Sequence, residues 1–464
     1  MRLKDIYPCG RVDRRRFLFQ AGGGFFGAAL GAMWADDGKL KDPMMGPHFP
    51  PKAKSVIFLF MCGGVSHIDT FDPKDNKFAG KMIDAVGFGD NVAEMRRPVI
   101  PCLRTFTNYG KSGIPVSDWF PNVGGVVDEI AFVRSMWCNE GNHFPAVIET
   151  TTGHRGRQFD HPTLGAWVTY ALGTANRNLP TFVNIGRPSS PVQETGGYLG
   201  ATVSATPFQP GDTPIPNLIP PKSSTAAERE KQMHALEALN QEFRERYAIN
   251  TDIQARTQAY ELAARMQLHA PAVVDFSKEP ENVKALYGIG EKETDDFGRQ
   301  LLLARRLAEQ GVRYIQICHA GGGNGAWDAH GDMKSHAPLC RAVDKPISGL
   351  IRDLKERGML DSTLVVFSSE FGRSPWSQNT TGRDHNPKGY TVWLAGGGIK
   401  GGTVHGATDD VGYKAVDHPH YYSDLHATIL NQVGLDYKKM EFNVFGRTMK
   451  LVEEGSGPIR EILA

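Results

Sequence analysis

The feature that most constrains the fold is an amphipathic segment followed directly by a short apolar one. Residues 339–357 carry apolar side chains at helical spacing, and residues 363–367 form a β-branched apolar run of strand length. Gly358 lies between them, as expected where a helix ends. A helix that returns the chain to a strand without polar alternation is typical of a parallel sheet covered by helices. The sequence therefore predicts a buried parallel strand at residues 363–367.

Polar side chains gather just beyond this predicted strand. Glu370 and Arg373 come first, and Arg383, Asp384 and His385 follow after a polar loop. Sites in open α/β sheets form outside the carboxyl ends of the strands. A carboxylate, a histidine and two arginines in that place indicate a metal site that handles an anion. The alternative is that Glu370 and Arg373 form a structural ion pair and that Asp384 and His385 make a turn.

The alternation of apolar strands with helices recurs along the chain. Further strands are predicted at residues 56–61, 130–134, 181–185, 312–317 and 392–395, and further helices at residues 164–172, 297–310 and 421–433. This order predicts an α/β/α sandwich with a mostly parallel central sheet. Residues 203–296 differ, because a proline-rich loop is followed by strong helix formers at 226–247 and 251–268. They are predicted to be a mostly helical insertion.

Three other predicted strand ends carry polar groups. After the first strand come Asp69 and Asp72, which are either site residues or caps of a tight turn. His143 lies at the predicted start of a helix, where backbone N–H groups favour an anion. Asp328 and His330 follow a glycine-rich strand end. Because polar residues follow several predicted strands in the same way, we expect these groups to meet at the carboxyl edge of the sheet.

Composition excludes several classes of protein. The chain has 464 residues, with 52 Lys and Arg against 51 Asp and Glu, so no basic excess indicates a nucleic-acid partner. The six cysteines include no C-x-x-C pair, which argues against a structural zinc site. Disulfides cannot be assigned from their positions.

The N-terminus is typical of a targeting segment. Residues 13–18 (DRRRFL) fit the twin-arginine pattern, and residues 19–34 are apolar and glycine-rich. The alternative, a charged turn before a core helix, is disfavoured by three consecutive glycines. We expect residues 1–35 to be a signal, 36–53 a linker and 54–464 the folded domain. The protein would then be exported to the periplasm or beyond, with cleavage near Ala32 or Ala35. An uncleaved leader would be its membrane contact.

Several of these segments resemble a known family. They are IFLFMCGGVSHIDTFDPK, HFPAVIETTTG, WDAHGD, VVFSSEFGRSP, GRDH and LAGGGIKGGTVHGATD. Together, over residues 54–445, they resemble the exported family called domain of unknown function 1501, which is placed in the sulfatase-like, alkaline-phosphatase-like superfamily. The resemblance implies that superfamily's α/β/α fold. It also implies a two-metal site that stabilises a transferring phosphoryl or sulfuryl group.

The resemblance also suggests roles, with departures. Glu370 stands where the superfamily has a metal-binding aspartate, and Phe371 replaces a histidine ligand. Asp328 and His330 match a segment that supplies an aspartate and a histidine, and His385 matches a later histidine or lysine element. After the first strand, glycines replace a metal-binding aspartate, so that Asp69 or Asp72 would have to substitute.

The largest departure is at the nucleophile. His143 stands where a cysteine, serine or threonine is usual, so the hydroxyl or thiol that the mechanism needs is missing. A histidine could form a covalent intermediate, or it could bind a metal whose water attacks. Equally, the loss of two ligands would be consistent with a site that binds one metal or none.

These observations lead to two functional hypotheses. The first is an exported metal-dependent hydrolase of sulfate or phosphate esters, with a small-molecule or glycan substrate. Its expected metal ligands are Asp69, Asp328, His330, Glu370 and His385. His143 would be catalytic or a ligand, and Arg373 and Arg383 would hold the anion. Mixed histidine and carboxylate ligands favour Zn²⁺ or Mn²⁺ over Ca²⁺ or Mg²⁺. The second hypothesis is a non-catalytic binding or scaffold protein that retains the fold.

Overall fold

A single large sheet runs through the protein, and its centre is parallel. The computed structural model describes residues 46–86, 94–156, 160–209, 251–377 and 381–464, with isolated positions at 215, 228, 231 and 235. In order across the sheet, the strands are β14 (Thr403–His405), β6 (Ile130–Trp137), β13 (Tyr390–Ala395), β10 (Thr363–Ser368), β1 (Ser55–Met61), β9 (Tyr314–His319), β7 (Phe182–Gly186) and β8 (Thr206–Phe208). Of these, β13 is antiparallel to both of its neighbours, and β17 (His420–Tyr421) also pairs with β6. The predicted α/β class with a mostly parallel sheet is confirmed.

Burial explains why the central strands have no polar alternation. Every residue of β1 and β10 is buried, and the two strands pair in parallel from Ser55 opposite Thr363 onward. Successive side chains of β1 enter different cores: Ile57 and Leu59 lie in one, and Phe58 lies in the other. A strand that faces two apolar layers must be apolar throughout.

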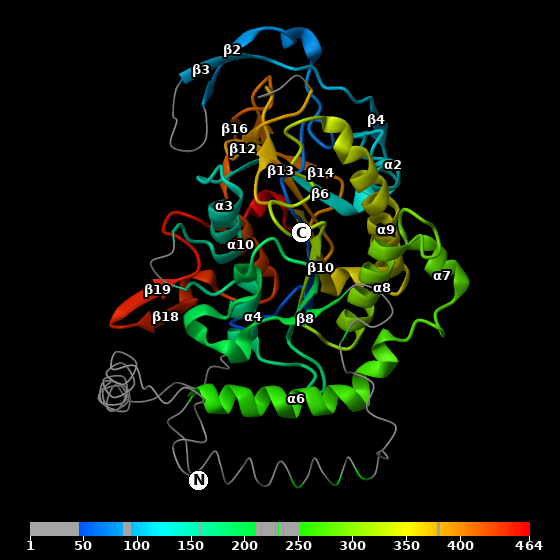
Figure 1. Cartoon of the computed structure of the whole chain (residues 1–464), viewed down its shortest axis with the longest axis vertical. Helices are drawn as coiled ribbons and strands as arrows, with labels where there is room; N and C mark the ends of the chain where they lie inside the picture. The colour runs from blue at the N-terminus through cyan, green and yellow to red at the C-terminus, as the bar shows by residue number, and fades with distance from the viewer. Residues whose placement is uncertain are drawn as a thin grey trace, which may run out of the picture.

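Helices cover both faces of the sheet (Figure 1). One layer holds α8 (Asp295–Glu309) and α9 (His336–Glu356), together with the short α2 (Pro121–Gly124). The other holds α3 (His143–Thr152), α4 (Leu164–Leu172) and α10 (Tyr422–Gln432). The predicted strands and helices within the described residues are all present, with ends that differ by a few residues.

Several small elements were not predicted. They include the hairpins β2–β3 (Met82–Val86, Glu94–Pro98), β4–β5 (Phe106–Tyr109, Ile114–Ser117) and β18–β19 (Glu441–Val444, Arg447–Lys450). The ladders β11–β12 (Gly372–Arg373, His385–Asn386) and β15–β16 (Ala407–Thr408, Ala415–Asp417) and helix α7 (Glu281–Leu286) were also unpredicted. Helix α6 (Thr251–Val274) extends past the expected end at residue 268.

Some predictions fall on residues that the structure does not describe. The signal at 1–35 lies outside the described residues, as does most of the predicted helix at 226–247. The five cysteines within the described residues are free. None of the helices in that part of the chain is both long enough and apolar enough to cross a membrane.

Candidate metal centre

Four side chains from three separate segments converge beyond the carboxyl ends of the central strands. His143 is the first residue of α3, Asp328 and His330 lie in the loop after β9, and His385 lies in β12. One ligand atom from each of these residues lies within 4.8 Å of all the others. The Nε2 atoms of His330 and His385 are 3.0 and 3.3 Å from Asp328 Oδ1. His143 Nε2 is 3.2 Å from Asp328 Oδ2.

Hydrogen bonds on the far side of two rings fix which nitrogen faces the centre. His385 Nδ1 lies 2.6 Å from the Gly141 carbonyl oxygen, which can only accept, so Nδ1 carries a proton. His143 Nδ1 lies 2.8 Å from Glu370 Oε1, and the Gly63 N–H donates to both oxygens of the same carboxylate. In the neutral rings, the Nε2 atoms of both His143 and His385 carry lone pairs. That of His143 faces Asp328, and that of His385 accepts from His330 Nε2, 2.8 Å away.

These lone pairs fit a cation. His143 Nε2 is buried and makes no hydrogen bond, although a carboxylate oxygen lies 3.2 Å away. Ligand atoms held about 2.0–2.1 Å from a tetrahedral ion lie roughly 3.3 Å apart, close to the spacings around Asp328. Three imidazoles and one carboxylate are donors that suit zinc or manganese. The residues present therefore fit one divalent ion.

The groups around Asp328 shift one another's pKa values. Burial alone would raise the pKa of Asp328, but its short contacts with the three imidazoles and the charge of Arg373 hold it well below its usual range. Burial lowers the pKa of His143, yet the nearby carboxylates of Asp328 and Glu370 outweigh this effect, and the pKa is raised. Burial keeps the pKa of His385 lowered. A proton on His143 therefore competes with a cation for the same position.

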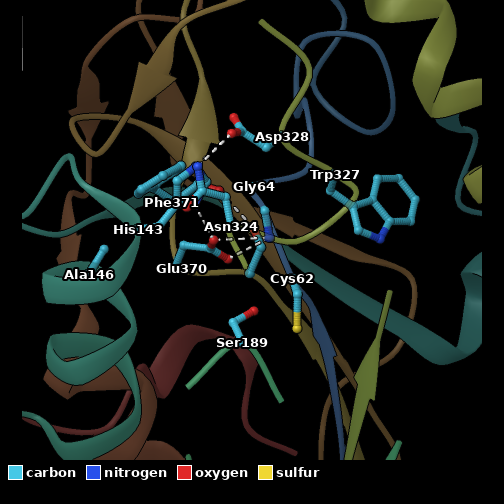
Figure 2. Close-up of polar contacts among 12 residues, drawn as sticks. Cys62, Gly64, His143, Ala146, Ser189, Asn324, Trp327, Asp328, Glu370 and Phe371 are labelled. Carbon is cyan, nitrogen blue, oxygen red and sulfur yellow. Dashed lines mark hydrogen bonds and ion pairs between the residues drawn. The ribbon is translucent and has the colours of Figure 1, made fainter. Parts of the chain in front are cut away.

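Glu370 acts one layer behind this centre. Its carboxylate is fully buried and bridges the Gly63 N–H and His143 Nδ1. Figure 2 shows Glu370 beside His143. Gly63 has a φ of +117°, and a Cβ there would lie 2.6 Å from the Asp328 backbone nitrogen. Glycine is thus required for the turn after β1 to pack against the Asp328 loop. Carboxylates that hold the outer nitrogen of a histidine ligand orient the ring and raise its basicity.

Arg373 holds Asp328 from the interior. Its guanidinium is fully buried and donates to Asp328 Oδ1 at 2.8 Å. It also donates to the carbonyl oxygens of four residues, which are Gly63, Gly64, Trp327 and Arg383. In the β11–β12 ladder Arg373 lies opposite His385, so the ladder sets both groups around Asp328. Arg373 therefore positions the carboxylate rather than facing outward as an anion clamp.

Phe371 forms an apolar wall beside two of the histidines. Its ring centroid is 5.0 Å from that of His143 and 4.5 Å from that of His385. Phe371, which replaces a histidine ligand of the superfamily, therefore packs against the imidazoles and limits their motion.

Asn324, in the glycine-rich loop, also contacts the centre. Its Nδ2 donates to Asp328 Oδ2 at 3.3 Å.

Asp69 and Arg383 form a separate buried pair. Arg383 Nε and its terminal nitrogen donate to the two Asp69 oxygens at 2.7 and 3.2 Å, and Ser66 donates its hydroxyl at 2.6 Å. Burial would raise the pKa of Asp69, but the charge and hydrogen bonds of Arg383 outweigh it, and the pKa is lowered. Asp72 accepts from Thr408 and pairs with Lys74.

The structure thus sorts the residues that the sequence singled out. It brings together His143, Asp328, His330 and His385, sets Glu370 behind His143, and leaves Asp69 with Arg383. The backbone groups of Gly63 and Gly141 were missed, because a backbone donor or acceptor has no residue signature. The glycines after β1 were the available signal for a close backbone approach.

Known structures and families provide the wider context. A lipoteichoic acid synthase from Listeria monocytogenes is 9% identical, with 88% of this chain and 76% of that chain covered and a TM-score of 0.39. A phosphonate monoester hydrolase from Agrobacterium radiobacter is 10% identical, with coverage of 89% and 77% and a TM-score of 0.36. A sulfatase from Pseudoalteromonas sp. is 13% identical, with coverage of 82% and 68% and a TM-score of 0.34. The chain matches no curated protein. Residues 53–463 match the family described as "Protein of unknown function (DUF1501)", and the chain belongs to that family.

Proposed function

We propose that the protein is a metal-dependent hydrolase of sulfate or phosphate esters, exported through the twin-arginine pathway. The observation that carries the proposal is the convergence of His143, Asp328, His330 and His385, whose ligand atoms lie within 4.8 Å of one another. The ester class comes from the resemblance of the sequence motifs to the sulfatase-like superfamily. The histidine-rich donor set favours Zn²⁺ or Mn²⁺.

The chain's own residues prepare this centre for chemistry on an anionic ester. A divalent ion held by the four side chains would polarise an ester oxygen and lower the pKa of water. Glu370 keeps the proton of His143 on Nδ1, so that Nε2 stays available. Arg373 keeps Asp328 ionised and oriented. The Phe371 ring excludes water from the side on which it packs against His143.

The geometry favours a ligand role for His143 over that of a nucleophile. Its Nε2 is the atom that either role would use, and that atom lies among the ligand atoms of the other three residues. A nucleophile would need to face substrate rather than the Asp328 carboxylate.

The test measures metal content and hydrolysis together on the purified full chain. Substrates are aryl sulfates, phosphate monoesters and phosphate diesters, each with added Zn²⁺, Mn²⁺, Ca²⁺ or Mg²⁺. Asp328→Ala is expected to abolish metal binding and turnover, whereas His269→Ala, at an exposed position, should change neither. His143→Ala separates its roles: loss of metal makes it a ligand, and loss of rate with metal retained makes it a nucleophile or acid.

A non-catalytic binding protein is the second candidate, and one observation favours it. The two arginines expected to clamp an anion are buried in contacts with Asp328, Asp69 and backbone carbonyls. No bound metal and no turnover on any of the ester classes would decide for this candidate.

Export rests on the sequence alone and has its own test. Changing Arg14 and Arg15 to lysine should keep folded protein in the cytoplasm, because twin-arginine recognition depends on that pair. Unchanged export of the variant would remove the localisation part of the proposal.

A further inference from the structure

A second cluster of metal-ligating side chains lies at the β14 edge of the sheet. His405 ends β14 and His420 begins β17, and both strands pair with β6. Glu461 approaches from η10 (Arg460–Ile462) near the C-terminus. One ligand atom from each of the three residues lies within 4.8 Å of the others. The two Nε2 atoms are 2.9 Å apart, and His405 Nε2 is 3.8 Å from Glu461 Oε2.

An acidic residue fixes the orientation of one of these rings. His420 Nδ1 lies 3.0 Å from Asp424 Oδ2, in the first turn of α10. A carboxylate can only accept, so the proton is on Nδ1 and the neutral ring directs the Nε2 lone pair at His405. The same carboxylate–imidazole arrangement supports His143 at the first centre, and it is typical of histidines that bind a metal.

The surroundings of His405 also suit a ligand. Its side chain is mostly buried, and its Nε2 lies 2.9 Å from His420 Nε2 and 3.8 Å from Glu461 Oε2. Glu461 is about half exposed, which leaves room for a water on the open side. Two histidines and a glutamate with one open position are a common zinc ligand set.

We propose that His405, His420 and Glu461 bind one divalent transition-metal ion of the zinc class, with Asp424 positioning His420. The ion would fasten the C-terminal segment to the sheet edge. That segment already bonds to the loop after β13, through Lys400 N–H to the Ile462 carbonyl at 2.8 Å and Ala464 N–H to the Gly398 carbonyl at 3.0 Å. The site is separate from the candidate centre at Asp328 and does not depend on the proposed hydrolysis.

Metal stoichiometry tests the proposal. The full chain is stripped with chelator, dialysed against Zn²⁺ alone, and analysed by mass spectrometry for zinc per chain. Two ions are expected for the parent, and one each for His405→Ala and Asp328→Asn. If the Asp328 centre binds no metal, the parent should hold one ion and His405→Ala none. An identical zinc count in His405→Ala and the parent would overturn the second site.

Two further variants test the site independently, in case His405→Ala does not fold. In the Asp328→Asn background, Asp424→Asn should weaken zinc binding by roughly 10- to 100-fold, as expected for a residue that orients a ligand. Glu461→Gln should weaken it as well, while Glu454→Gln, at an exposed position, should leave it unchanged. Circular dichroism confirms the fold of each variant. Unchanged zinc affinity in both Asp424→Asn and Glu461→Gln would overturn the proposal.

Discussion

Asp69 and Asp328 are both aspartates at the carboxyl edge of the sheet, and each pairs with an arginine. Asp69 follows β1 and pairs with Arg383, whereas Asp328 follows β9 and pairs with Arg373. From sequence alone, both are acidic groups after a strand and were predicted to share one metal site. Their surroundings differ in a way that separates a structural ion pair from a candidate metal ligand.

The difference lies in what each carboxylate faces. Asp69 receives Arg383 on both oxygens and the Ser66 hydroxyl on one, all of them proton donors, and its side chain is 1% exposed. Asp328 receives Arg373 on one oxygen and Asn324 on the other, is 15% exposed, and has the Nε2 atoms of three imidazoles within 3.3 Å. Donors meet every side of the Asp69 carboxylate, whereas Asp328 also faces the lone pair of the neutral His143 ring, a position that a cation would fill. Burial and an arginine partner alone do not identify a ligand.

The largest expected effect is on the Asp69 side. Asp69→Ala should lower the free energy of unfolding by about 3–5 kcal/mol, because it leaves the buried Arg383 charge uncompensated. The measurement is denaturant unfolding in the presence of chelator, so that metal binding does not contribute. Asp118→Ala is the control, since its pair with Arg104 is partly exposed and should be worth less than about 1 kcal/mol. An equally small loss in Asp69→Ala would remove the structural interpretation of that pair.

Asp328→Asn should affect metal affinity strongly and the free energy of unfolding only a little. Metal affinity should fall by more than the roughly 10- to 100-fold that outer residues cost, because a charged ligand is lost. Unfolding in chelator should change less than for Asp69→Ala, because Arg373 keeps four carbonyl acceptors and the amide retains an oxygen. Calorimetric metal titration and denaturation of the same preparation give both values. Retained metal affinity would place the ion elsewhere.

Glu370→Gln addresses the layer behind the metal centre. The amide can still accept from His143 Nδ1 but carries no charge, so we expect metal affinity to fall by about 10- to 100-fold. Hydrolysis should fall in parallel when metal is limiting and recover at excess metal. Glu356→Gln, at an exposed helical position, is the control. A complete loss of metal binding would instead make Glu370 a ligand, as predicted from the sequence.

The sequence predicted the frame well and the contacts poorly, for physical reasons. Apolar runs over β10 and the periodicity of α4 reveal burial locally, so their bounds could be predicted to within a residue or two. The contact of Glu370 with Gly63 spans 307 residues, and that of Arg383 with Asp69 spans 314. Which carboxylate meets which partner at such separations depends on tertiary packing. The hairpins β2–β3 and β18–β19 lie outside the main sheet and lack an apolar run that would mark them.

The smallest effect that we predict is a pH dependence on the Asp69 side. His336 is fully buried, and its Nε2 accepts the N–H of Ser66, the residue that also bonds Asp69. Burial lowers the pKa of His336 to about 3, with the nearby Arg373 acting in the same direction. In the unfolded chain the pKa of a histidine is about 6.5. The unfolded state therefore binds more protons between these two values.

It follows that the contribution of His336 to stability is complete above about pH 6.5 and is lost as the pH falls toward 3. Between pH 8 and pH 5.5 the loss should be about 1.4 kcal/mol, from one pH unit below the unfolded pKa. His336→Gln keeps an acceptor for Ser66 but cannot titrate. Between pH 8 and pH 5.5, its unfolding free energy in chelator should therefore fall by about 1.4 kcal/mol less than that of the parent. His269→Gln, at an exposed position, should retain the parental difference. If His336→Gln shows the same difference in unfolding free energy between the two pH values as the parent, His336 is not the group that titrates. The hydrogen bond from Ser66 would then not hold the His336 ring neutral in the folded protein.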